Sequence, residues 1–225
     1  MTRTIVYIDG FNLYYRALKP LGHKWMNIDA LSEAVLPASN RITAIRYYTA
    51  RVSGRTDPGA PARQHAYLRA LESLPRVTIH YGNFLTGKKW SGLVQPPAFR
   101  PVCALPPGVV PQVAYVWKTE EKGSDVNLVG VHLVRDAFTH AFDEAAVLTN
   151  DTDLVEPIRI VTQEVGLPVT LLTPVSRVLK PSHPATSLVA VSTHVRHIEP
   201  YLGPCEFPDP VKLANGKTIK KPAGW

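Results

Sequence analysis

Short apolar stretches rich in β-branched residues alternate with segments of helical periodicity along most of the chain. Strands alternating with helices are typical of a parallel sheet with covering helices. The pattern predicts strands at residues 3–9, 41–50, 76–85, 144–150 and 168–172, and helices beginning near Asn27, Pro61, Ser124, Thr152 and Ala185. We expect the last of these helices to end near Val195.

The predicted fold class is therefore α/β, as a three-layer α/β/α sandwich with a mostly parallel central sheet. A chain of 225 residues can form one such domain and a small appendage. We place the domain at residues 1–200. Residues 201–225 are predicted to be a C-terminal extension, in which Asn215-Gly216 indicates a hairpin.

A proline-rich insertion interrupts the alternation at residues 86–112, which contain six prolines. Proline excludes helix and interior strand, so we expect no regular structure there and a short strand afterwards at 113–118. Lys88, Lys89 and Trp90 combine cations with a stacking surface, a pairing used by proteins that bind single-stranded nucleic acid. The insertion is interpreted either as a flap over a substrate or as a disordered segment without a role.

Two of the predicted strands stop abruptly at carboxylates, one at Asp9 and the other at Asp151 and Asp153. Ligands of open α/β sheets bind outside the carboxyl ends of the strands. Asp125, near the start of a predicted helix, is expected at the same edge. Each aspartate alone is explained by a turn or a helix cap, but several converging carboxylates would repel one another without a cation.

Oxygen ligands without His or Cys favour Mg²⁺ or Mn²⁺ at this edge, with Asn12 and Asn150 adding neutral oxygens. His132 is a weaker candidate, because it lies about 10 Å beyond Asp125 along the helix axis. The chemistry supported by carboxylate-bound Mg²⁺ is mainly phosphoryl transfer and phosphodiester hydrolysis.

The charge balance is basic, with 25 Lys and Arg against 18 Asp and Glu and a net charge of +7. Such a surface favours polyanionic partners, although a solvated positive excess without a role explains it equally well. The cations that we expect to bind nucleic acid are Arg51, Arg55, Arg63, Lys118 and Lys122, with Lys88, Lys89 and Trp90 of the insertion. Each of them alone is more readily explained as a solvated surface charge.

The two cysteines, Cys103 and Cys205, have no metal-binding or disulfide-framework spacing, which suits a reducing cytosol. The sequence has neither an apolar run of about 20 residues nor the apolar core of a signal peptide. We therefore predict a soluble, cytoplasmic protein that does not bind membranes.

Three motifs occur in the order found in one known family: Ile-Asp-Gly-Phe-Asn-Leu-Tyr-Tyr at 8–15, Lys-Thr-Glu-Glu-Lys-Gly-Ser-Asp-Val-Asn-Leu at 118–128 and Thr-Asn-Asp-Thr-Asp-Leu at 149–154. Over residues 3–175 the chain resembles the NYN domain family, relatives of the PIN-domain nucleases. The resemblance implies a PIN-like sandwich and a metal-dependent ribonuclease. By motif, the metal would be held by Asp9, Asp125, Asp151 and Asp153, with Asn12 beside them.

The functional prediction is accordingly a Mg²⁺- or Mn²⁺-dependent ribonuclease in which a metal-activated water attacks single-stranded RNA. One alternative is a non-catalytic RNA-binding module of the same fold. A second is a small-molecule phosphatase, which the Phe at position 11 argues against, because phosphatases with Asp-Gly after a strand have a second Asp there. Homo-oligomerisation and the mode of cleavage stay open.

Overall fold

The computed structural model describes residues 1–55, 57–99, 102–122, 125–175 and 183–225; of residues 84–86, 119–122 and 125–126 it describes the backbone alone. The chain divides into two compact units. The larger unit comprises Met1–Asn83 and Gly123–Trp225, and the smaller one is Phe84–Lys122.

A parallel sheet forms the centre of the larger unit, with the strand order β3-β2-β1-β5-β6-β7 and parallel pairing between neighbours. Its strands are β1 (Thr2–Asp9), β2 (Asn40–Ala50), β3 (Val77–Gly92), β5 (Glu144–Leu148), β6 (Val169–Thr173) and β7 (His194–His197). The chain proceeds outward from β1 through β2 to β3, and then returns to the other side of β1 at β5. Ligand crevices of α/β sheets lie where the strand order reverses in this way, here between β1 and β5.

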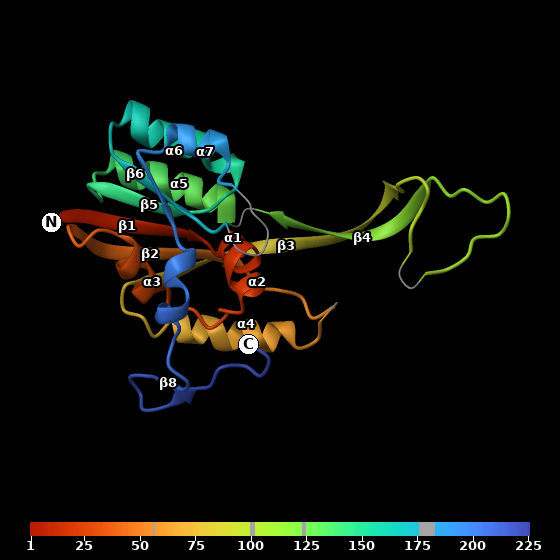
Figure 1. The fold of residues 1–225 in the computed structure, drawn as a ribbon, viewed down its shortest axis with the longest axis horizontal. Helices are drawn as coiled ribbons and strands as arrows, with labels where there is room; N and C mark the ends of the chain where they lie inside the picture. The colour runs from red at the N-terminus through yellow and green to blue at the C-terminus, as the bar shows by residue number, and fades with distance from the viewer. Residues whose placement is uncertain (56, 100–101, 123–124, 176–182) are drawn as a thin grey trace. The chain divides into compact units, whose positions relative to one another are not determined.

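Helices cover both faces of this sheet, which confirms the predicted α/β/α sandwich (Figure 1). The helices are α1 (Gly10–Leu13), α2 (Lys19–Leu21), α3 (Ile28–Val35), α4 (Ala60–Leu71), α5 (Asp125–Phe138), α6 (Val155–Arg159) and α7 (Thr186–Val191). A π-helical turn, Tyr14–Leu18, joins α1 to α2, and another, Ile160–Glu164, follows α6. The 3₁₀ turn Thr152–Leu154 precedes α6.

Alternate strand residues supply two separate cores, because successive side chains of a strand point to opposite faces. Val6 and Ile8 of β1 and Tyr47 of β2 belong to the core beneath α3 and α4. Tyr7 and Tyr48 belong to the core beneath α5. The Tyr47–Tyr48 pair thus contributes one ring to each face of the sheet.

The prediction that the last helix ends near Val195 is wrong. Helix α7 stops at Val191, Ser192 is extended, and His194–His197 form β7. Strand β7 extends the sheet beyond β6, with Thr170 opposite His194. Pairing with a free sheet edge is a tertiary effect that helical periodicity does not report.

The smaller unit contains the end of β3 and strand β4 (Val113–Lys122), which lies beside β3 in the sheet (Figure 1). The expectation that no regular structure exists from residue 86 is wrong for Lys88–Gly92, which are part of β3. The prolines begin only at Pro96, so the strand can continue to that point. On this unit Trp90 packs 5.1 Å from Tyr115, and the Lys88 ammonium lies 4.9 Å from the Trp117 ring centroid.

Residues after β7 complete the larger unit. Leu202 and Phe207 join the core beneath α3 and α4, near the 3₁₀ turns Glu199–Tyr201 and Gly203–Cys205. Strands β8 (Val211–Lys212) and β9 (Thr218–Ile219) pair antiparallel around a turn in which Gly216 has φ 78°. Within the described ranges, no helix has the length and apolar character needed to cross a membrane.

Candidate functional site

The acidic edge lies at the carboxyl ends of β1 and β5, and Asp9 is its buried centre. Asp9 caps α1: its Oδ1 accepts from the Asn12 backbone N–H at 3.0 Å and its Oδ2 accepts from Asn12 Nδ2 at 2.6 Å. The Thr149 hydroxyl donates to the same Oδ2 at 3.1 Å. Internal donors therefore stabilise the Asp9 carboxylate.

The second acidic motif continues this hydrogen-bonded edge. Asn12 Oδ1 accepts from the Asn150 backbone N–H at 3.3 Å, and Asn150 Oδ1 accepts from the backbone N–H of Ala185 at 2.8 Å. Asp151 caps the turn before α6 by accepting from the Asp153 N–H at 3.1 Å. Asp153 itself is exposed and lines a surface hollow with Asn127 and Pro157, between α5 and α6.

Within the described residues, the structure brings together part of the expected ion site. Asp9, Asn12, Asn150 and Asp151 are joined by one hydrogen-bonded chain through Thr149, whereas the side chain of Asp125 lies outside the described residues. Among the described side chains, no group of three His, Cys, Asp or Glu residues has an arrangement that could hold a metal ion.

A cavity of about 250 Å³ opens beside the acidic edge, on the α4 face of the sheet. It is lined by six aromatic side chains: Phe11, Tyr14, Tyr15, Tyr47, Tyr67 and Trp225. The π-helical turn begins at Tyr14, and such turns are frequent at functional sites. Trp225 packs 5.8 Å from Tyr67 and 6.2 Å from Tyr14, measured between ring centroids, so the end of the described chain contributes to the cavity wall.

Gly10 permits the close packing at the base of this cavity. A Cβ at this position would lie 2.6 Å from the carbonyl oxygen of Tyr48 and 2.7 Å from the hydroxyl of Tyr47. The Tyr47 side chain is buried, and burial together with the charge of Asp9 raises the pKa of its phenol. Tyr47 therefore stays protonated at neutral pH and can donate a hydrogen bond.

Most polar groups of the cavity lie on α4 or in the segment between β2 and α4, and Lys19 comes from α2. Arg63 forms an ion pair with Asp57, and Lys19 lies 5.5 Å from the centroid of the Tyr15 ring. Gln64 holds the segment after β2 in place, since its amide donates to the Ala50 carbonyl at 2.8 Å and accepts from the Val52 N–H at 3.0 Å.

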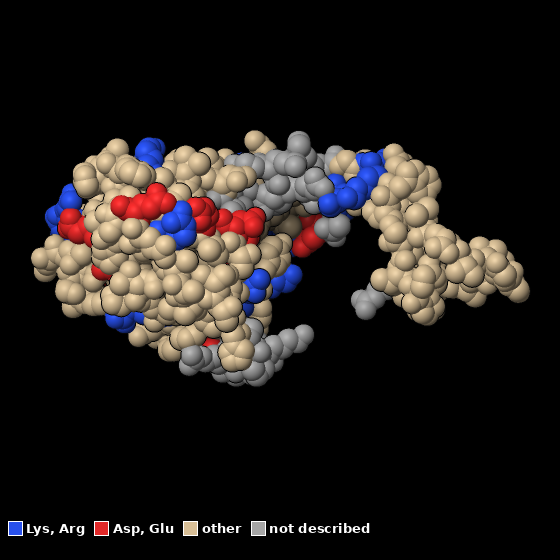
Figure 2. Space-filling model, turned by 90° about the horizontal axis from the view of Figure 1, so that it is seen from above, with Lys and Arg blue, Asp and Glu red and all other residues tan. Residues whose placement is uncertain are grey.

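The predicted nucleic-acid cations are divided between the two units. Arg51 lies over the Tyr81 ring at 4.8 Å, Arg55 is exposed, and Arg63 belongs to the aromatic cavity. The other expected contacts, Lys88, Lys89, Trp90, Lys118 and Lys122, belong to the smaller unit, and the side chain of Lys122 lies outside the described residues. On the face of the larger unit drawn in Figure 2, acidic side chains lie beside basic ones and no separate basic tract is visible.

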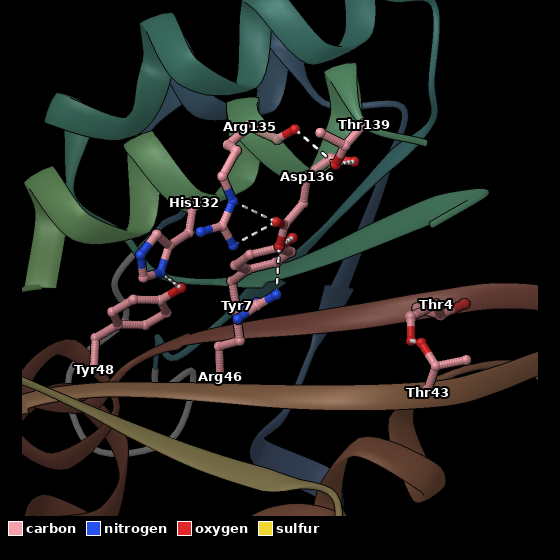
Figure 3. Close-up of polar contacts among 9 residues, drawn as sticks. All are labelled: Thr4, Tyr7, Thr43, Arg46, Tyr48, His132, Arg135, Asp136 and Thr139. Atoms are coloured by element: carbon pink, nitrogen blue, oxygen red, sulfur yellow. Dashed lines mark hydrogen bonds and ion pairs between the residues drawn. The ribbon is translucent and has the colours of Figure 1, made fainter. Parts of the chain in front are cut away.

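A second polar cluster lies on the opposite face of the sheet and centres on the buried carboxylate of Asp136 (Figure 3). It accepts from the Tyr7 hydroxyl at 2.8 Å and pairs with Arg46 at 2.8 Å and with Arg135 at 2.6 Å. Although burial favours the neutral acid, the hydrogen bonds from Arg135 and Tyr7 and the nearby charges lower the pKa of Asp136. These contacts connect α5 to β1 and β2.

Two histidines adjoin this cluster. His132 Nδ1 lies 3.0 Å from the Tyr48 hydroxyl (Figure 3), and the His80 ring stacks on Tyr48 with centroids 4.9 Å apart. Burial, the neighbouring His132 and two arginines lower the pKa of His80 to about 4. Burial and the arginines also lower the pKa of His132. Both rings are therefore neutral at physiological pH.

Sequence reasoning missed the aromatic cavity. Tyr14 and Tyr15 are part of the first family-like motif, but their distance from Tyr67 and Trp225 in the chain hides their convergence. Arg63, one of the cations expected to bind RNA, lies in this cavity. The available signal was the density of tyrosines in the first 70 residues, which does not by itself distinguish a cavity from a core.

No protein-family model matches the chain. The chain is similar to a solved protein of unknown function from Vibrio parahaemolyticus, with a TM-score of 0.53, 11% identity and coverage of 88% of this chain and 93% of that one. This likeness concerns the fold alone. In sequence, the chain is 27% identical to the 6-hydroxy-3-succinoylpyridine 3-monooxygenase HspA of Pseudomonas putida over 248 aligned residues, 99% of this chain and 75% of that protein.

This relative overturns the functional prediction. A monooxygenase is an oxidoreductase, so the predictions of a ribonuclease, of a hydrolase and of a Mg²⁺ or Mn²⁺ cofactor are wrong. At the acidic edge, Asp9 and Asp151 act as caps, and their carboxylates accept hydrogen bonds from neighbouring donors. The resemblance to the NYN domain family, the RNA partner and homo-oligomerisation stay predictions.

Proposed function

We propose that the protein is a cytoplasmic monooxygenase that hydroxylates a small aromatic or N-heteroaromatic ring bound in the cavity beside Gly10. The observation that carries the proposal is the cavity itself, in which six aromatic side chains surround about 250 Å³. This volume is slightly below that of typical ligand pockets, ~300–1,000 Å³, which restricts the cavity to a small ligand. The similarity to a protein named for the monooxygenation of a substituted pyridine supports the same reaction type.

The residues of the cavity suit the binding of a flat ring. Phe11 stacks on Tyr15 with centroids 6.1 Å apart, and Tyr14 meets Tyr15 edge to face at 5.0 Å, so a ligand ring can join an existing aromatic array. The protonated hydroxyl of Tyr47 donates a hydrogen bond to an oxygen substituent on the ring. Trp225 packs against Tyr14 and Tyr67 and extends the aromatic wall against which the ligand ring lies.

The proposed reaction consumes dioxygen and a two-electron donor of the reduced nicotinamide class. At a ring carbon that carries hydrogen, as in the simpler hydroxypyridines, one oxygen atom replaces that hydrogen as a hydroxyl group. The other oxygen atom leaves as water after it has taken up two electrons and two protons.

The test is an oxygenation assay with 6-hydroxy-3-succinoylpyridine and simpler hydroxypyridines, NADH and isotopically labelled dioxygen, with and without added flavin. We expect a product that contains one labelled oxygen. Tyr47→Phe should lower the rate about tenfold, because the substrate loses one hydrogen-bond donor. Tyr81→Phe is the matched control, since Tyr81 is exposed and does not line the cavity. The absence of labelled product from every substrate would refute the proposal.

A further inference from the structure

Arg63 occupies an unfavourable position unless an anion accompanies it. It lies in the first turn of α4, where the helix dipole raises the free energy of a positive charge. Its side chain is 31% exposed and pairs with Asp57, whose side chain is 54% exposed. A Cβ at Gly59 would meet Arg63 Nη1, so the guanidinium lies directly against the loop before α4.

Asp57 is a replaceable partner for this arginine. Its Oδ2 pairs with Arg63 and its Oδ1 accepts from the Gly59 N–H at 3.1 Å, so both oxygens are held by the cavity rim. Because Asp57 is half exposed, water can solvate its carboxylate when the ion pair separates, and exposed ion pairs contribute little to stability. A carboxylate brought by a ligand could bind the guanidinium through two parallel hydrogen bonds, a stronger arrangement.

The remaining charges of the cavity favour the same class of ligand. Lys19 and Arg63 are positive and Asp57 is negative, so displacement of Asp57 leaves two cations facing the aromatic walls. We propose that the cavity binds a small aromatic ring carrying a carboxylate, and that Arg63 exchanges Asp57 for this carboxylate on binding. The inference rests on the proposed function, because it takes the aromatic cavity as the substrate site.

Calorimetric titration with nicotinate and nicotinamide tests the exchange, because these ligands share one ring and differ in charge. The wild type should bind nicotinate about tenfold more tightly than nicotinamide. Arg63→Gln should abolish this preference, and Arg63→Lys should keep part of it. Asp57→Asn removes the competing carboxylate, so it should tighten nicotinate several-fold and leave nicotinamide unchanged. Arg69→Gln, an exposed cation later on the same helix and outside the cavity lining, is the matched control.

The inference is overturned if the ratio of nicotinate affinity to nicotinamide affinity is the same in the wild type and in folded Arg63→Gln. It is also overturned if Asp57→Asn binds nicotinate more weakly than the wild type does, or if the wild type binds neither ligand. Circular dichroism establishes that each variant is folded. The oxygenation assay tests the proposed function separately. A preference for nicotinate over nicotinamide without turnover supports the carboxylate site and contradicts the proposed function. Turnover without a preference for nicotinate supports the proposed function and contradicts the carboxylate site.

Discussion

Gly10 connects the acidic edge to the aromatic cavity, since it follows Asp9 directly and lines the cavity. Gly10→Ala should destabilise the protein by about 1–3 kcal/mol, because the carbonyl of Tyr48 belongs to a central strand and cannot move away from the new methyl group. The displaced Tyr47 ring should also weaken ligand binding. Urea denaturation and calorimetry measure the two effects. Gly92→Ala is the control, because a Cβ there meets no atom within 4 Å; equal stabilities of the two variants would contradict this account.

At the scale of elements, the contact of α5 with the sheet should make stability depend on pH. The folded state holds the pKa of His80 at about 4, whereas an unfolded histidine titrates near ~6.5. Between these values the unfolded chain binds more protons, so stability is complete above the upper value and falls as pH decreases through the window. The lowered pKa values of His132 and Asp136 act in the same direction.

Substitution of His80 by Gln should therefore reduce the loss of stability that accompanies falling pH. Urea midpoints measured between about pH 7 and pH 4 give the slope for each variant. His65→Gln, which alters an exposed histidine on α4, should keep the wild-type slope. A wild-type slope in His80→Gln would show that other groups govern the pH dependence.

At the scale of the whole molecule, the smaller unit should be dispensable for the cavity. Every residue that lines the cavity belongs to the larger unit, which has its own two cores. Replacement of residues 84–122 by a flexible Gly/Ser linker should leave a folded protein that binds nicotinate as the full chain does. Thermal unfolding followed by circular dichroism and calorimetry test this. Loss of the cooperative transition would mean that β4 is required for the sheet.

The sequence by itself determined the layers of this protein. Apolar runs such as Ile5–Ile8 and Ala145–Leu148 are buried on both faces of the sheet, and the alternation of strand and helix requires helices on each side. The position of Asp9 at a strand end was also evident, because a carboxylate cannot continue a buried strand without partners. Local patterns in the sequence suffice to predict these features, because the features depend on residues that are neighbours in the chain.

Only the tertiary structure decided what lies beside that strand end. Phe11, Tyr47, Tyr67 and Trp225 converge because four separate segments pack together, and no periodicity reports contacts between residues so far apart in the chain. The same holds for β7, whose strand state depends on the free edge of β6. A carboxylate motif in the sequence indicates an acidic edge. The donors that bind each carboxylate are decided by folding, which brings Thr149 and Asn12 within hydrogen-bonding distance of Asp9.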